Sequence, residues 1–275
     1  MAKERESVRR NGDPEGRASL GVSGPEHDLP RPEGTIRPYV ICCAPRSGST
    51  LLTQLLHASG RMGVPAEYLN ERFLVAKLGA RFGTLDADGR VMPNTYLRAL
   101  GAHRTSSNRV FGIKVLFSQM ERWVLTTVFR RILGAAQFVW LRRRDQVGQA
   151  ISLFVAQQTH RWHLDTGDPL GDPSAAPIAP RYSAELIRRA LGTILSEEAG
   201  WERFFAVNDV QPLVVQYEDL TADPDRVCRA ICERMGVTDV GPFRLDRASS
   251  RPTASALNAE WRDRWIDDMR FRGRS

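Results

Sequence analysis

Residues 39–50 read YVICCAPRSGST, and this stretch decides the fold. Its first five residues form an apolar run without polar alternation, which is typical of a β-strand covered on both faces. A short turn of glycine and serine follows, and from Thr50 to His57 the apolar residues recur at helical spacing. The ordered part of the chain therefore begins with a buried strand, a tight turn and a helix.

Strands and helices continue to alternate downstream. Apolar runs at residues 110–117, 137–141 and 213–217 predict three further strands, and residues 62–64 predict a short one. Alternating strands and helices indicate a parallel sheet with helices on both faces. We therefore expect an α/β fold that is P-loop-like: a three-layer α/β/α arrangement with a mainly parallel central sheet.

Capping residues mark several of the helices. A helix follows strand 137–141, Ser183 begins a long helix that extends to about Ala206, and Asp223-Pro224 begins another. The tail places apolar residues four apart, as an amphipathic helix does: Leu257, Trp261, Trp265 and Met269.

The chain of 275 residues, 42% of them hydrophobic, is long enough for one large domain. Residues 1–36 are polar, charged and rich in glycine and proline, so we expect a disordered leader. The domain is then expected over residues 37–275. Residues 164–181 are rich in proline and glycine and predict a long loop, a candidate lid.

Charge and cysteine content limit the partners. A formal net charge of +7 favours acidic ligands such as nucleic acid, anionic lipid or a phosphorylated cofactor. No aromatic-rich strand or zinc-type spacing accompanies the charge, so we expect no nucleic-acid partner. No signal peptide is recognisable and no apolar run approaches ~18 residues, so we expect no membrane span. The four cysteines lack metal-ligand spacing and indicate packing residues in a cytoplasmic protein.

The turn at residues 44–50 has the chemistry of an anion site. A turn between a buried strand and a helix directs several backbone N–H groups to one point, where the helix dipole adds about half a positive charge. Around Gly48, the residues Ser47, Ser49 and Thr50 add hydroxyl donors, and Arg46 adds a planar, permanently charged donor. We predict that this turn binds a phosphate group.

The turn also departs from the P-loop of nucleotide triphosphatases. That motif ends in Gly-Lys-Ser/Thr, with the lysine on the terminal phosphates and the hydroxyl on magnesium. Here Ser49 follows Gly48, and the cation stands earlier, at Arg46. This difference disfavours a magnesium-dependent triphosphatase, and we expect no metal.

The residues at this point resemble a known family. Residues 45–52 are similar to the 5′-phosphosulfate loop of sulfotransferases, and the arginine form resembles the bacterial trehalose 2-sulfotransferase family. The resemblance runs from about residue 37 to residue 269. It includes residues 63–67, 112–114, 143–152, 158–159, 162, 200–201 and 217–220. It implies a homodimeric enzyme that transfers a sulfuryl group from 3′-phosphoadenosine-5′-phosphosulfate (PAPS) to a hydroxyl of a small molecule.

The resemblance implies two anchoring points for this donor. By this resemblance the turn is expected to bind the 5′-phosphosulfate. In this family an arginine after the corresponding strand and a serine one or two helical turns later bind the 3′-phosphate, and Arg143 and Ser152 stand at those positions. Arg144 stays open as an alternative to Arg143, because the alignment has one residue of slack. A solvated basic run that pairs with Asp145 is the second alternative.

Transfer to an alcohol needs a group that accepts the hydroxyl proton, such as a carboxylate or an imidazole. Glu67 matches the proposed base of the family's Gly-x-Pro-x-Glu segment, and the crossover after the first helix should bring it beside Arg46. Lys114 interrupts an apolar strand, and a lysine is rarely buried unless it is paired. The resemblance implies that Lys114 acts near the donor or the acceptor. A histidine base is the alternative, since many other sulfotransferases use one.

The acceptor side is less defined. The expected acceptor-binding residues are Gln158, Thr159, His160 and Trp162. A sugar, or a sugar-containing or other secondary metabolite, is the expected acceptor class. Two other functions remain open from the residues alone: a P-loop kinase of small molecules with a displaced lysine, and a non-enzymatic module that binds nucleotides or RNA.

Overall fold

A computed structural model of the chain describes residues 22–159, 179–248 and 256–270. Four strands carry the sheet: β1 (Arg37–Cys43), β2 (Val110–Leu116), β3 (Gln137–Arg142) and β4 (Leu213–Gln216). The α-helices are α1 (Ser49–Ala58), α2 (Ala76–Arg81), α3 (Pro93–His103), α4 (Phe117–Trp123), α5 (Thr127–Ala135), α6 (Gln146–Thr159), α7 (Ala184–Val207), α8 (Tyr217–Ala222), α9 (Pro224–Arg234) and α10 (Ala256–Met269). A π-helical turn, η2 (Glu71–Val75), leads into α2, and two short 3-10 turns are η1 (Pro25–His27) and η3 (Leu245–Arg247).

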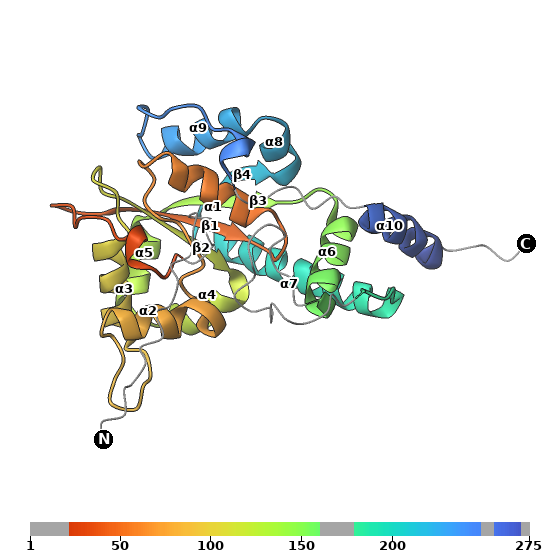
Figure 1. Ribbon diagram of the computed structural model, residues 1–275, viewed down its shortest axis with the longest axis horizontal. Helices are drawn as coiled ribbons and strands as arrows, with labels where there is room; N and C mark the ends of the chain where they lie inside the picture. The colour runs from red at the N-terminus through yellow and green to blue at the C-terminus, as the bar shows by residue number, and fades with distance from the viewer. Residues whose placement is uncertain (1–21, 160–178, 249–255, 271–275) are drawn as a thin grey trace, which may run out of the picture.

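The strands form one parallel sheet in the order β2-β1-β3-β4. At the carboxyl edge Cys43 pairs with Leu116 of β2 and Leu141 of β3, and Arg142 pairs with Gln216 of β4. The chain segments that follow these strands therefore leave the sheet side by side. Helices cover both faces of the sheet (Figure 1), so the predicted α/β/α fold with a parallel sheet is confirmed.

Strand β1 supplies residues to both core layers, because side chains of a strand alternate between faces. Tyr39, Ile41 and Cys43 pack with the buried faces of α1 and α9. Val40 and Cys42 pack on the opposite side with residues of α2 to α5 and α7. Figure 1 shows α1, α8 and α9 above the sheet and α2, α3 and α4 below it. All four cysteines are buried and free, as predicted.

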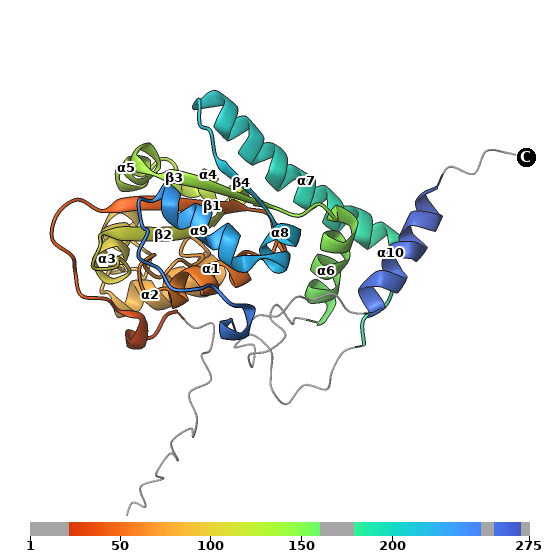
Figure 2. The same ribbon diagram turned by 90° about the horizontal axis from the view of Figure 1, so that it is seen from above.

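A third core cluster lies beyond the sheet, where α6, the start of α7 and α10 pack together (Figure 2). Trp261 contacts Phe154 of α6 with 6.0 Å between the ring centroids. The Trp265 indole Nε1 donates to the backbone carbonyl of Ala184, at 3.2 Å. The predicted apolar stripe of the tail helix is therefore confirmed for these residues, whereas Met269 at its end is 46% exposed.

The short strand predicted at residues 62–64 is absent. Gly63 adopts a left-handed conformation with φ +67°, which an extended strand does not contain. A Cβ there would lie 2.8 Å from the carbonyl oxygens of Arg104 and Val110, so only glycine fits. The segment meets the sheet two residues later, through an isolated parallel bridge between Ala66 and Ile113.

Packing against the domain begins before the expected boundary at residue 37. The backbone N–H of Leu29 donates to the carbonyl of His103 at 2.9 Å, and Asp28 accepts from Arg81 and Arg104. Residues 1–21 and most of the proposed lid, residues 164–178, lie outside the described residues. Within the described ranges no helix has the length and apolar character needed to cross a membrane.

Candidate active site

The predicted phosphate turn lies at the carboxyl edge of the sheet, between β1 and α1. Gly48 has φ +86°, and Arg46 has φ 62°, which is rare for a residue with a side chain. These two left-handed residues turn the chain sharply, so that α1 begins at Ser49 directly behind the turn. The Gln149 Nε2 of α6 donates to the carbonyl of Pro45 at 2.7 Å and fixes the turn from the side.

Within the described part of the chain, the turn has a buried hydroxyl without a partner and a helix start without a side-chain cap. Ser47 is fully buried, and its hydroxyl has no partner among the described residues. No described side chain caps the start of α1. A buried polar group without a partner costs free energy, and such groups in native proteins call for an explanation. An anion bound in the turn would satisfy both the Ser47 hydroxyl and the helix N–H groups.

Two arginines converge beside this turn. The Arg46 Nε donates to the Ser152 hydroxyl at 3.0 Å, which links the turn to α6. Burial lowers the pKa of Arg46, and the nearby positive charge of Arg143 lowers it further. The Nε of Arg143 is buried without a partner among the described residues. The structure thus gathers Arg46, Arg143 and Ser152 into one cationic cluster, although the serine contacts Arg46 rather than Arg143.

Arg144 is oriented differently from Arg143. Its side chain is 56% exposed, and its Nη2 donates to both carboxylate oxygens of Asp219 at 2.8 Å. Asp145 pairs with Arg262 of α10 at 3.2 Å. Of the two neighbouring arginines, Arg143 is therefore the one whose donors are not already used by carboxylates of the described chain.

Glu67 and Lys114 form an ion pair at the β2 side of the same edge. The bridge between Ala66 and Ile113 brings the two segments together, and the Lys114 Nζ lies 2.6 Å from the Glu67 Oε2. The other carboxylate oxygen, Oε1, accepts from the Asn70 Nδ2 at 2.6 Å and from the Gln119 Nε2 at 2.7 Å. Glu67 is therefore held by three donors.

The pair is ionised. Burial raises the pKa of the Glu67 carboxyl, but the charge and hydrogen bond of Lys114, with the amides of Gln119 and Asn70, lower it to below its ordinary value. Burial lowers the pKa of Lys114, but the charge and hydrogen bond of Glu67, together with Cys43, raise it to above its ordinary value. Glu67 contacts Lys114 directly, and Lys114 in turn senses the charge of Arg46. The expected proximity of Glu67 and Arg46 is therefore supported only through Lys114, whose pKa the charge of Arg46 lowers.

Sequence reasoning missed three polar residues of this edge: Asn70, Gln119 and Gln149. Asn70 stands three residues after Glu67, and Gln119 lies in the first turn after β2. Gln119 is held in place because its Oε1 accepts from the backbone N–H of Leu116 at 3.2 Å. The one available signal was position, since polar residues directly after a parallel strand reach the ligand-binding edge.

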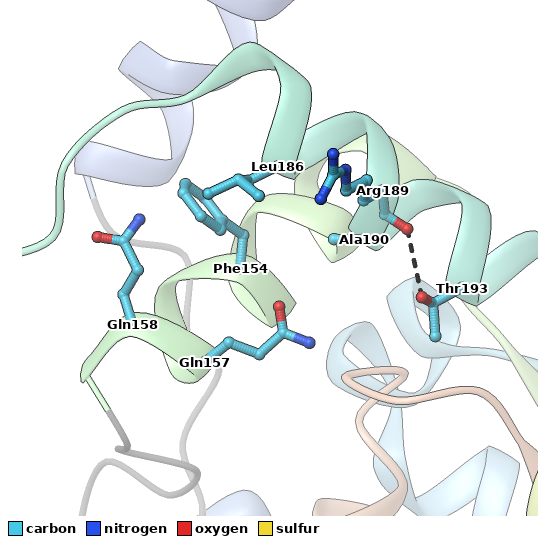
Figure 3. A pocket seen from close by; sticks show the side chains of 7 residues that line it. All are labelled: Phe154, Gln157, Gln158, Leu186, Arg189, Ala190 and Thr193. Carbon is cyan, nitrogen blue, oxygen red and sulfur yellow. Dashed lines mark hydrogen bonds between the residues drawn. The ribbon is translucent and has the colours of Figure 1, made fainter.

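Of the expected acceptor residues, Gln158 and Thr159 lie at the far end of α6. Gln158 exchanges two hydrogen bonds with the backbone of Arg181, each at 2.8 Å, and the Thr159 hydroxyl donates to the carbonyl of Val155 at 2.8 Å. His160 and Trp162 lie outside the described residues. Gln158 lines a pocket of about 270 Å³ between α6 and α7 (Figure 3), with Phe154 and Leu186 as its apolar wall. None of the cationic residues described above lines this pocket.

The chain is similar to known sulfotransferases over most of its length. It is 25% identical over 261 residues to the trehalose 2-sulfotransferase of Mycobacterium tuberculosis, covering 84% of this chain and 94% of that relative. It is 25% identical over 266 residues to the trehalose 2-sulfotransferase of Mycolicibacterium smegmatis, with the same coverage. A solved sulfotransferase from Alicyclobacillus acidocaldarius aligns over 86% of this chain and 93% of its own, with 17% identity and a TM-score of 0.44.

The family assignment rests on a match to the sequence model of a protein family. The model described as Stf0 sulphotransferase matches residues 38–270, which is most of the chain. This confirms the resemblance seen in the sequence and sets aside the kinase and the non-enzymatic binding module. The chain is an enzyme that belongs to the Stf0 sulphotransferase family.

Proposed function

We propose that this enzyme transfers a sulfuryl group from PAPS to a hydroxyl of a sugar or of a sugar-containing or secondary metabolite. The observation that carries the proposal is the row of groups along one edge of the sheet. It contains a turn with a buried unpaired hydroxyl, two converging arginines and an ionised carboxylate. Such a row suits a donor with two phosphates and an acceptor that must lose a proton.

The donor residues divide into two groups in this proposal. The N–H groups at the start of α1, with Arg46, Ser47, Gly48, Ser49 and Thr50, bind the 5′-phosphosulfate. Arg143, with Ser152, binds the 3′-phosphate. The charge of Arg143 lowers the pKa of Arg46, so the two guanidinium groups repel each other. A ligand that places one phosphate on each arginine would remove this repulsion. No metal is needed, because Arg46 and the helix N-terminus stabilise the charge on the leaving phosphate.

Glu67 is the proposed base. As the acceptor oxygen bonds to sulfur, the bond between sulfur and the phosphate oxygen breaks, and adenosine 3′,5′-bisphosphate leaves. The hydroxyl proton goes to Glu67. Its Oε1 already accepts two hydrogen bonds, whereas its Oε2 accepts one from Lys114, so Oε2 is the oxygen with room for the proton. Lys114 stays charged and steadies the transferring sulfuryl oxygens.

The acceptor class follows from the relatives named trehalose 2-sulfotransferase. At 25% identity they support a sugar hydroxyl as the acceptor group. For the acceptor side we propose Gln158, Thr159, His160 and Trp162. We also propose that the enzyme works in the cytoplasm as a homodimer, as the family resemblance implies, and without a nucleic-acid partner. Light scattering on the purified chain tests the dimer directly.

Transfer of labelled sulfate from PAPS to a panel of disaccharides, including trehalose, and hydroxylated metabolites tests the reaction. For Glu67→Gln we expect kcat to fall by about 10²–10⁴-fold, since a general base contributes that much. The variant should bind adenosine 3′,5′-bisphosphate as the wild type does, because Glu67 is not among the donor-binding residues. Glu121→Gln, an exposed glutamate on α4, is the matched control and keeps full activity.

Two results contradict the proposal. Activity of Glu67→Gln within a few fold of the wild type removes the base assignment. A melting temperature that adenosine 3′,5′-bisphosphate leaves unchanged, while ATP with magnesium raises it, removes the donor assignment.

A further inference from the structure

Residues 217–219, Tyr-Glu-Asp, belong to the family resemblance but have no part in the reaction proposed above. They follow β4 directly, at the start of α8. The register pairs Gln216 with Arg142, so these residues lie beside the 143–145 turn at the carboxyl edge of the sheet. All three of them contact that turn.

Glu218 fixes the backbone of the turn. Its carboxylate accepts from the N–H of Arg144, at 3.1 Å to each oxygen, and from the N–H of Asp145 at 3.3 Å. A carboxylate on backbone N–H groups is a strong, charge-assisted contact. Asp219 takes the side chain of Arg144, as described above. Glu218 thus holds the 143–145 turn through its backbone N–H groups, and Asp219 holds the Arg144 side chain away from Arg143.

Tyr217 fixes the side chain of Arg143. The guanidinium carbon of Arg143 lies 4.9 Å from the centre of the Tyr217 ring. Stacking on a ring uses the flat face of a guanidinium and leaves its in-plane N–H donors free for an anion. This agrees with the unpaired, buried Nε of Arg143.

The same ring packs against the phosphate turn. A Cβ added at Gly48 would come within 2.3 Å of the Tyr217 Cδ2, so the ring lies directly on that glycine. One aromatic side chain therefore touches both the turn that carries Arg46 and the arginine of the second anion site. It sets the spacing between them.

We propose that Tyr217 and Glu218 are positioning residues that hold Arg143 next to the phosphate turn, so that the enzyme binds both phosphates of one nucleotide. The inference rests on the proposed function, because it assigns the second phosphate to Arg143. Neither residue needs to contact the reacting atoms. Their effect is on affinity for the 3′-phosphate and on the choice between nucleotides with and without it.

Calorimetric titration of the full chain with adenosine 3′,5′-bisphosphate and with adenosine 5′-monophosphate tests the proposal. For Glu218→Ala we expect the Kd of the bisphosphate to rise about 10- to 100-fold, since hydrogen bonds to a charged group contribute about 1.5–3 kcal/mol. The Kd of the monophosphate should change by less than about twofold. Glu233→Ala, an exposed glutamate on α9, is the control and leaves both values unchanged.

Two further variants separate positioning from general stability. Tyr217→Phe keeps the ring and should bind the bisphosphate like the wild type, whereas Tyr217→Leu should weaken it. In an Arg143→Ala background, Glu218→Ala should add little further loss, because Glu218 acts on the 3′-phosphate only by positioning Arg143. Tyr217→Leu provides the same test if Glu218→Ala does not fold.

The possible results discriminate clearly. If Glu218→Ala weakens both nucleotides equally, or if its effect adds fully to that of Arg143→Ala, the positioning role is wrong and the proposed function stands. If the wild type itself binds both nucleotides equally, the 3′-phosphate site is wrong and the positioning role falls with it.

Discussion

At the scale of single residues, Lys114 sets the acidity of Glu67. Burial raises the pKa of this carboxyl, and the ammonium group 2.6 Å away is the largest of the contributions that lower it again, with the hydrogen bonds of Gln119 and Asn70 adding to it. In Lys114→Met the burial remains and the cation is gone. We therefore expect the pKa of Glu67 to rise above its ordinary 4.5, and the acidic limb of the kcat/KM profile to move to higher pH.

The lowered pKa of Glu67 also makes the stability of the folded state depend on pH. A depressed carboxyl pKa stabilises the folded state above the ordinary 4.5, and this contribution is lost as the pH falls through the lower folded value. Lys114→Met removes this contribution. The variant should therefore be less stable than the wild type at neutral pH, and it should lose less stability than the wild type as the pH falls. Lys77→Met, at an exposed lysine of α2, serves as control. An acidic limb that stays in place in a folded Lys114→Met variant contradicts the assignment.

The residues around Glu67 show what a sequence alone can place. Glu67 and Lys114 were identifiable because one matches a family segment and the other is a cation in an apolar strand. Asn70 and Gln119 were not, since their role depends on the bridge between Ala66 and Ile113 that aligns the two segments. Polar residues that act through tertiary contacts carry no local pattern.

At the scale of elements, the long and strongly patterned ones were predicted. The strands β1 to β4 are apolar runs, and the caps of α7 and α9 were read correctly, because Ser183 accepts from Leu186 N–H and Asp223 from Arg226 N–H. The helices α2 to α5 were not defined from the sequence. Helices such as α2 and α4 are too short to show periodicity, and tertiary packing stabilises them.

Packing between α4 and α7 makes the clearest prediction at this scale. Gly200 of α7 lies against the Phe117 ring, where an added Cβ would come within 2.2 Å of the Cδ1. Glu197, one turn earlier, accepts from the backbone N–H of Ser118 at 3.2 Å. These contacts hold α4, which carries Gln119 to Glu67. We expect Gly200→Ala to lower both the melting temperature and kcat.

Gly192→Ala in the same helix is the matched control. A Cβ at Gly192 has nothing within 4 Å, so alanine there should stabilise the helix by about 1 kcal/mol. Thermal unfolding and sulfate-transfer assays of the two variants give the comparison. If Gly200→Ala is as stable and as active as Gly192→Ala, α7 does not position α4 in the way described.

At the scale of the whole molecule, the segment before β1 packs on the domain through Asp28. Asp28 accepts from Arg81 and Arg104, and the Arg104 side chain is fully buried. The sequence placed residues 1–36 in a leader because their composition is polar. The ion pairs of Asp28 are contacts distant in sequence, which composition does not reveal.

Removing this carboxylate leaves a buried cation without its partner, which is costly. For Asp28→Ala we expect a loss of about 2 kcal/mol and a melting temperature lower by about 4–8 °C at neutral pH. Burial raises the pKa of Asp28, but the hydrogen bonds and charges of Arg81 and Arg104 together lower it to below its ordinary 3.8. The contribution of Asp28 to stability is thus present above pH 3.8 and is lost as the pH falls, so the stabilities of wild type and variant should converge in acid.

Glu33→Ala, an exposed change in the same segment, is the reference. Equal melting of Asp28→Ala and Glu33→Ala at neutral pH, measured by calorimetry, means that residues 22–36 do not stabilise the domain.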